Sequence, residues 1–231
     1  MPHAFYQLIG NGVYSLPEAS RLTRIPTKRI RRWMEGYSFI SSGKRVDSPP
    51  VLLPDIGRSA GRLALSFADL LELRFLEAFS EYVSWHSIRI AAARARDIVQ
   101  KQHPFSSRTF KTDGKHILME IAEPGGVPDL LNLVSNQFEF RKVVSPMLFA
   151  GIEFASNDEA ARWWPMGRRR TVVIDPVHSF GAPISVDGYV PTFILAASAK
   201  AEGAQVRAAR IFDVPVRAVR HAVEYETRYL A

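Results

Sequence analysis

Apolar residues at helical spacing predict two short helices close together near the start of the chain. In the first, Ser15 and Glu18 have the spacing of a capping box, and Pro17 suits a first helical turn. An Arg-Ile-Pro stretch interrupts the pattern, and Thr27 is expected to cap a second helix that runs to about Gly36. The side chains expected to be buried are Leu16, Ala19 and Leu22 on the first helix and Ile30, Trp33 and Met34 on the second.

The rest of the pattern predicts a largely helical chain with short β-segments. Turn residues and strand-like stretches favour β-hairpins at 37–54 and 109–118, the second on an Asp-Gly turn, and a β-run at 171–174. Ser66 is expected to cap a helix. The helices expected after the first hairpin are 66–80, 84–101, 128–135, 141–150, 191–203, 205–211 and 216–229. The fold class is therefore expected to be mainly α with small β-hairpins.

Positive charge is concentrated at one end of this pattern. Residues 1–62 contain ten Lys or Arg and four Asp or Glu, a net charge of +6. Residues 63–231 contain the remaining 20 basic and 19 acidic residues, so they contribute only +1 to the total of +7. Such asymmetry indicates a module that binds a polyanion, joined to an electrically balanced partner region.

Composition excludes several classes of protein. With no cysteine, the chain has no disulfide, no thiolate metal site and no Cys nucleophile, which fits a reducing cytoplasm. The sequence contains no run of 18 or more apolar residues, so a transmembrane helix is not expected. The first 17 residues have no positive start and no unbroken apolar block, so we expect an intracellular N-terminus and a cytoplasmic protein.

The second short helix has the strongest chemical signal. Its polar face combines Lys28, Arg31 and Arg32 with Glu35, and Arg29 lies on the flank. Like charges at this spacing repel each other, but the face suits a helix in a DNA major groove, where Arg and Lys bind base edges and phosphates. The alternative is a solvated basic face. The residues expected to bind DNA are Thr27, Lys28, Arg29, Arg31 and Arg32 on this helix and Lys44 and Arg45 at the tip of the following hairpin.

Residues 14–26 and 28–33, with 65–74 after them, resemble the winged helix-turn-helix of MerR-like regulators over roughly residues 10–101. Residues 180–192, 201–203, 214–215 and 219–226 resemble a small helical antitoxin domain, the domain of unknown function family 433. There Tyr189 and Val190 stand where Arg and Ile are common.

The combination of these two regions resembles VapB-type antitoxins. The resemblance implies a MerR-like DNA-binding domain over 1–101, a connecting region with a β-hairpin and helices over 102–174, and a C-terminal three-helix, helix-turn-helix-like antitoxin domain over 175–231. It also implies that the protein represses its own operon and neutralises a PIN-domain (VapC-type) ribonuclease toxin. A homodimer is expected, because operators with two half-sites suit two-fold proteins.

The last helix offers a possible second contact face. Arg217, Arg220, His221 and Arg228 are expected to share one side, opposite Val216, Val219 and Val223. This face could contact DNA or a partner, or it could be an exposed surface of mixed charge on a dimerisation domain.

The sequence gives little evidence for an enzymatic activity. The pairs His178–Asp175 and His116–Asp113 lack a nucleophile and an orienting group, and neither a phosphate loop nor a zinc-ligand spacing occurs. We therefore expect no catalytic residues, no metal and no cofactor. Two alternatives stay open: a ligand-responsive MerR-like regulator, with a pocket near the Trp163–Trp164 pair, and a protein-interaction module whose basic end is incidental. The run 168–170 is expected to be solvated, or to touch phosphate or an acidic partner.

Overall fold

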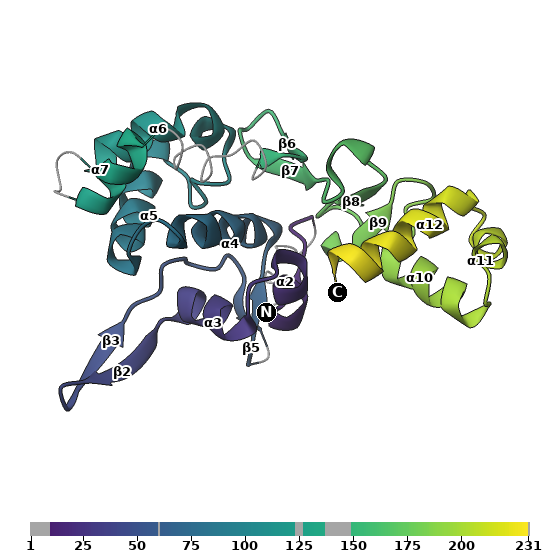
Figure 1. Cartoon of the computed structure of the whole chain (residues 1–231), viewed down its shortest axis with the longest axis horizontal. Helices are drawn as coiled ribbons and strands as arrows, with labels where there is room; N and C mark the ends of the chain where they lie inside the picture. Colours follow the sequence, from purple (N-terminus) through teal and green to yellow (C-terminus); the bar gives the residue numbers. More distant parts are fainter. Residues whose placement is uncertain (1–9, 60, 123–126, 137–148, 231) are drawn as a thin grey trace, which may run out of the picture. The chain divides into compact units, whose positions relative to one another are not determined.

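The computed structural model describes residues 10–59, 61–122, 127–136 and 149–230, and the chain divides into two compact units (Figure 1). The N-terminal unit comprises Ser15–Phe149 and Ser156–Glu159, and the C-terminal unit comprises Met1–Tyr14, Ala150–Ala155 and Ala160–Ala231. The described elements are mainly helices with small antiparallel sheets, which confirms the expected fold class. Among the described helices, none has the length and hydropathy that a membrane span requires.

The two short helices expected near the start of the chain are α2 (Leu16–Thr23) and α3 (Thr27–Glu35). The capping box of α2 is present, because Ser15 Oγ accepts from the Glu18 N–H and the Glu18 carboxylate accepts from the Ser15 N–H at 2.8 Å. The expectation that Thr27 caps α3 is wrong. Pro26 occupies the cap position with an extended backbone, so Thr27 is the first residue inside the helix and no side chain caps it.

The β-hairpin expected after α3 consists of β2 (Tyr37–Ser41) and β3 (Lys44–Ser48), paired antiparallel with Phe39 opposite Val46. It extends away from the helices of its unit (Figure 1). The strands end earlier than the expected range of 37–54. Beyond them, the N–H groups of Val51 and Leu52 donate to the Trp33 carbonyl at 2.8 and 3.1 Å, which ties this stretch to α3.

A second hairpin follows that the sequence did not predict. It consists of β4 (Gly57–Ser59) and β5 (Arg62–Leu65), and β1 (Tyr14–Ser15) lies on the other side of β5. These strands have only two to four residues each, too few for an alternating pattern to stand out from the chain.

Helices α4 (Phe67–Ser80) and α5 (Trp85–Val99) agree with the expected ranges, and Ser66 caps α4 through the Asp69 N–H at 3.1 Å. α7 (Pro128–Ser135) agrees as well. The helix expected at 141–150 falls almost entirely outside the described residues.

The hairpin expected at 109–118 is wrong, because this segment lies in a helix, α6 (Arg108–Ala122). The buried residues recur at helical spacing over its whole length, whereas the Asp-Gly pair gave only a local turn signal. Gly114 sits inside the helix against the ring of Phe110, where an added Cβ would lie 3.3 Å from the ring. The buried side of α6 consists of Phe110, Gly114, Ile117, Leu118, Ile121 and Ala122.

The C-terminal unit contains a four-stranded antiparallel sheet, in which the strands lie in the order β6-β7-β8-β9. Only β8 (Val172–Ile174) was expected; the strands β6 (Ile152–Phe154), β7 (Ala160–Trp163) and β9 (Pro183–Ser185) were not. Val173 of β8 and Ile184 of β9 form a small buried cluster with Trp164.

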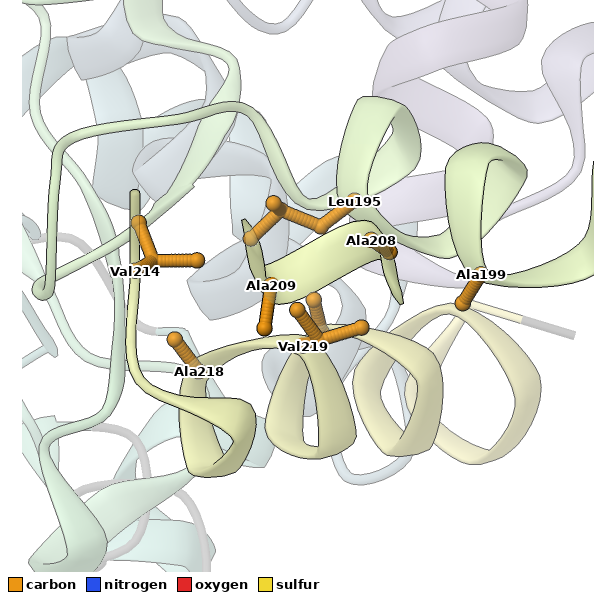
Figure 2. Packing of buried hydrophobic residues seen from close by; sticks show 8 residues of the cluster. Leu195, Ala199, Ala208, Ala209, Val214, Ala218 and Val219 are labelled. Carbon is orange, nitrogen blue, oxygen red and sulfur yellow. The ribbon is translucent and has the colours of Figure 1, made fainter. Parts of the chain in front are cut away.

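Three helices follow the sheet, as expected: α10 (Thr192–Ala201), α11 (Gln205–Ile211) and α12 (Val216–Glu224). The chain continues from α12 through one π-helical turn, Tyr225–Tyr229. Leu195 of α10 and Val219 of α12 are fully buried between the helices, and small side chains allow the close approach (Figure 2). The buried cluster consists of Leu195, Ala199, Ala208, Ala209, Val214, Ala218, Val219 and Ala222.

One contact within the C-terminal unit joins its two most distant segments. The Tyr14 hydroxyl donates to the Gly181 carbonyl at 2.9 Å across 167 residues of sequence, and the Val13 N–H donates to the Phe180 carbonyl at 3.0 Å. A Cβ on Gly181, which has φ +82°, would lie 2.2 Å from the Tyr14 hydroxyl oxygen. The close approach therefore requires glycine.

Candidate nucleic-acid interface

Helix α3 separates an apolar side from a basic side. Ile30, Trp33 and Met34 are buried, as the periodicity predicted. Trp33 packs against Trp85 with ring centroids 5.0 Å apart, so it is a core residue and not a stacking platform. Burial of these three side chains fixes the rotation of α3 and turns its cations outward. The exposed residues on α3 are Thr27, Lys28, Arg29, Arg31 and Arg32.

The exposed cations of α3 differ in the side chains with which they interact. Arg29 forms an ion pair with Glu77 of α4, which partly neutralises it. Arg32 lies over the ring of Tyr37 with its guanidinium carbon 4.8 Å from the ring centroid. Within the described chain, Lys28 and Arg31 have no hydrogen-bond or ion-pair partner. Two cations thus face solvent without compensation and one is oriented by an aromatic ring.

The tip of the β2–β3 hairpin is less basic than the sequence suggested. Arg45 donates to the Asp47 carboxylate at 3.1 Å and to Ser38 Oγ at 2.9 Å, so its charge is balanced by a neighbour. Hydrogen bonds from Ser38 and Arg45 lower the pKa of Asp47, which keeps the pair charged. Lys44 is exposed beside them.

Two further arginines lie beside α3 that sequence reasoning missed. Arg58 and Arg62 come from β4 and β5, and with Arg31 they line a cavity of about 400 Å³. Their position depends on the unexpected β4–β5 hairpin. The excess of positive charge in residues 1–62 included both residues, and it was the one sequence signal that could have pointed to them.

The candidate second face on α12 is largely neutralised. Arg217 forms an ion pair with Asp187 at 3.2 Å. Glu224 accepts a hydrogen bond from Arg169 at 2.9 Å and forms an ion pair with Arg228 at 3.6 Å. Arg220 is exposed and His221 is half-buried. Of the valines expected opposite this face, Val219 is buried and Val216 is 41% exposed, because Ala218 and Ala222 fill the packed side of the helix.

The tryptophan pair lies in the core of the C-terminal unit, and two arginines of the run 168–170, Arg169 and Arg170, form ion pairs. Trp163 and Trp164 are buried, and Arg170 lies over the Trp164 ring at 5.2 Å while pairing with Glu153 at 2.8 Å. His178 lies 3.1 Å from Asp175, whose carboxylate also accepts from Arg162 at 2.7 Å. Burial acts to raise the pKa of Asp175, but hydrogen bonds from Arg162, Val177 and His178 hold it below its ordinary value.

A cluster of titratable groups lies under the N-terminus of α4. His103 Nε2 lies 2.9 Å from Asp55 and 3.9 Å from Asp69, and these three residues place ligand atoms within 4.8 Å of one another, a spacing compatible with a cation. Their hydrogen bonds serve the fold, because Asp69 accepts the N–H groups of Ser66 and Asp55 at 2.9 and 3.2 Å.

Burial raises the pKa of Asp69 to about 6 and that of Glu72 to about 7. Burial acts to lower the pKa of His103, but its bond to Asp55 and the nearby carboxylates raise it. His116 and Asp113 form no such cluster and are exposed on α6.

The chain is similar to a curated protein and to a solved structure, both from Mycobacterium tuberculosis. No family model matches the chain. A protein of Mycobacterium tuberculosis (strain ATCC 25618 / H37Rv) named "Putative antitoxin VapB45" is 27% identical over 186 residues, which cover 74% of this chain and 76% of that protein. The X-ray crystal structure of Rv2018 from Mycobacterium tuberculosis superimposes with a TM-score of 0.69 at 26% identity, covering 91% of this chain and 96% of that chain. Both similarities span about three quarters or more of the chain.

Proposed function

We propose that this protein is the antitoxin of a type II toxin–antitoxin pair. The observation that carries the proposal is similarity over about three quarters of both chains to a protein named as a VapB antitoxin. A VapB-type antitoxin acts by binding, so the proposal fits a regulatory protein and not an enzyme. The partner implied by the VapB resemblance is a PIN-domain (VapC-type) ribonuclease.

DNA binding by α3 is the second part of the proposal. A short helix fixed by a buried Ile30–Trp33–Met34 side, preceded by α2 and followed by a hairpin, has the element order of a winged helix-turn-helix. Its free cations, Lys28 and Arg31, can bind phosphates and guanine edges. We propose that the protein binds operator DNA as a homodimer through this face and represses its own operon. The hairpin residues Lys44 and Arg45 would contact the neighbouring backbone.

The test combines growth rescue with capture of both partners. The PIN-domain nuclease from the native host is expressed with and without this protein, and the tagged protein is purified with whatever DNA and protein it binds. Restored growth, co-purified nuclease and the protein's own promoter DNA are the expected result. Promoter DNA without nuclease would contradict the antitoxin role and leave a ligand-responsive regulator. Nuclease without salt-sensitive DNA binding would contradict the operator role.

A further inference from the structure

The cavity beside α3 combines three guanidinium groups with one carboxylate. It lies between the start of α2, helix α3 and the β4–β5 hairpin, and its volume is about 400 Å³. Arg31, Arg58 and Arg62 line it together with Glu35, so these side chains give it a net charge of +2. A cavity of this size is within the range of pockets that bind small ligands or parts of larger ones.

Three hydrogen bonds orient the Arg58 guanidinium in this cavity. Its Nε and one terminal nitrogen donate to the two oxygens of Glu35 at 2.7 and 3.1 Å, and the other terminal nitrogen donates to the Gly61 carbonyl at 2.9 Å. A guanidinium has five N–H groups, so two remain after these three bonds. Glu35 is therefore a positioning residue, because it orients a fork of donors that still has capacity to bind an anion.

The other two guanidinium groups are not compensated. In the described residues, neither Arg31 nor Arg62 has a hydrogen-bond or ion-pair partner, and both are exposed. Like charges gathered around one cavity repel each other, and an anion with several oxygens removes this cost. Guanidinium forks match the oxygens of phosphate in geometry as well as charge.

We infer that this cavity binds a phosphate group. In the complex with operator DNA, which is the proposed function on which this part rests, the phosphate belongs to the DNA backbone. Arg31 lies on the exposed side of α3, so a duplex that receives α3 in its groove presents backbone phosphates beside this residue. With this site, the proposed DNA-binding surface includes Arg58 and Arg62. Arg31 then contacts a backbone phosphate and not a base edge.

The first experiment tests the site without DNA. Inorganic pyrophosphate is titrated into the ¹⁵N-labelled full chain, and amide shifts are followed at Gly61 and Leu63. We expect saturable shifts in the native protein and none in Arg62→Glu, while Lys115→Glu, an exposed control on α6, retains them. Arg62 has no described partner, so its replacement leaves the fold intact.

The second experiment identifies the source of the phosphate. Affinity for promoter DNA is measured from low to moderate salt for the native protein, Arg62→Ala, Arg58→Ala and Lys115→Ala. Loss of one phosphate contact should make the slope of log K against log salt less steep by about one unit, equally for all sequences. Arg62→Lys, which keeps the charge without the fork, should restore most of the slope.

The two experiments separate the outcomes. Pyrophosphate shifts without DNA binding would support the site for a free phosphorylated compound and contradict the operator role. DNA binding with an unchanged slope in Arg62→Ala and Arg58→Ala, together with no pyrophosphate shifts, would overturn the site and leave the operator role standing.

Discussion

Two pairs of helices in this chain look alike and differ in charge. α2 and α3 in the N-terminal unit, like α11 and α12 in the C-terminal unit, are short helices joined by a turn, and a proline precedes the second helix of each pair. In both pairs the second helix buries one apolar side. On α3 two cations have no described partner. On α12 Arg217 is paired with Asp187, and in the turn that follows α12 Arg228 is paired with Glu224.

The two helix pairs therefore differ in how many of their cations are available to bind an anion. A paired arginine must give up its carboxylate before it can bind a phosphate, and a free one need not. The basic face of α3 is therefore the better candidate, and the following predictions test the contrast.

The largest effect is expected from matched double substitutions on the two helices. Arg31→Ala with Arg32→Ala should weaken binding to promoter DNA by about 2–6 kcal/mol, because each contact contributes about 1–3 kcal/mol. Arg217→Ala with Arg220→Ala removes the same charge and should change affinity by less than about 1 kcal/mol. Fluorescence anisotropy with labelled DNA measures both. Equal losses would mean that both helices bind DNA.

A core substitution in one unit should lower the stability of that unit more than the stability of the other. Ile30→Ala in α3 and Leu195→Ala in α10 each remove a fully buried side chain and should lower the free energy of unfolding by about 2–5 kcal/mol. Urea denaturation followed by ¹⁹F signals of fluorotryptophan reports each unit, because Trp33 and Trp85 lie in one and Trp163 and Trp164 in the other. If Leu195→Ala shifted all four signals equally, the units would unfold as one.

Helix capping should give a smaller effect. Ser15→Ala removes the capping box of α2 and should lower stability by about 1 kcal/mol. Ala204 occupies the cap position of α11 with an extended backbone and no side-chain bond, so Ala204→Ser should raise the stability of the C-terminal unit by up to about 1 kcal/mol. Thermal unfolding measures both changes, and a destabilised Ala204→Ser variant would contradict the cap geometry.

The last contrast concerns the sign of the pH dependence. In the N-terminal unit, the raised pKa values of Asp69 and Glu72 favour the folded state at low pH, so their contribution to stability is lost as pH rises from about 4 to about 7. In the C-terminal unit, the lowered pKa of Asp175 has the opposite effect, and its contribution is lost as pH falls below the ordinary value of 3.8.

Two isosteric variants test these signs. Glu72→Gln keeps the acceptor for the Ser106 N–H, so it should flatten the loss of stability toward neutral pH in the N-terminal unit. Asp175→Asn should flatten the loss toward acid in the C-terminal unit. Unfolding curves at a series of pH values provide the measurement, and an unchanged pH profile in Glu72→Gln would show that this carboxyl does not titrate there.

Helices were predictable from the sequence where their apolar spacing continued over several turns. That holds for α3, with Ile30, Trp33 and Met34, and for α4, α5 and the three C-terminal helices. At 113–114 the Asp-Gly pair is a turn signal of only two residues, and it lies inside a helix of fifteen residues whose buried positions recur at helical spacing.

Apart from β8, the short strands of the two multi-stranded sheets could not be predicted, because so few residues show no alternating pattern and their stability comes from the strands they pair with. β7 pairs with β8 through Trp163 and Ile174, for example. The same holds for the candidate site. Its residues on α3 could be predicted from the helical periodicity, whereas the positions of Arg58 and Arg62 depend on the β4–β5 hairpin, which the sequence did not predict.

The hydrogen bond from Tyr14 to Gly181 has a consequence for synthesis on the ribosome. At about 5–20 residues per second, roughly 8 to 30 seconds pass between the emergence of these two residues. Most of the N-terminal unit, up to Phe149, is available to fold during this interval, whereas the Tyr14 hydroxyl and the Val13 N–H gain their acceptors, Gly181 and Phe180, only at its end. Nascent chains should therefore acquire α2 to α7 first, and the Tyr14 segment should become protected from protease only after Gly181 has been added.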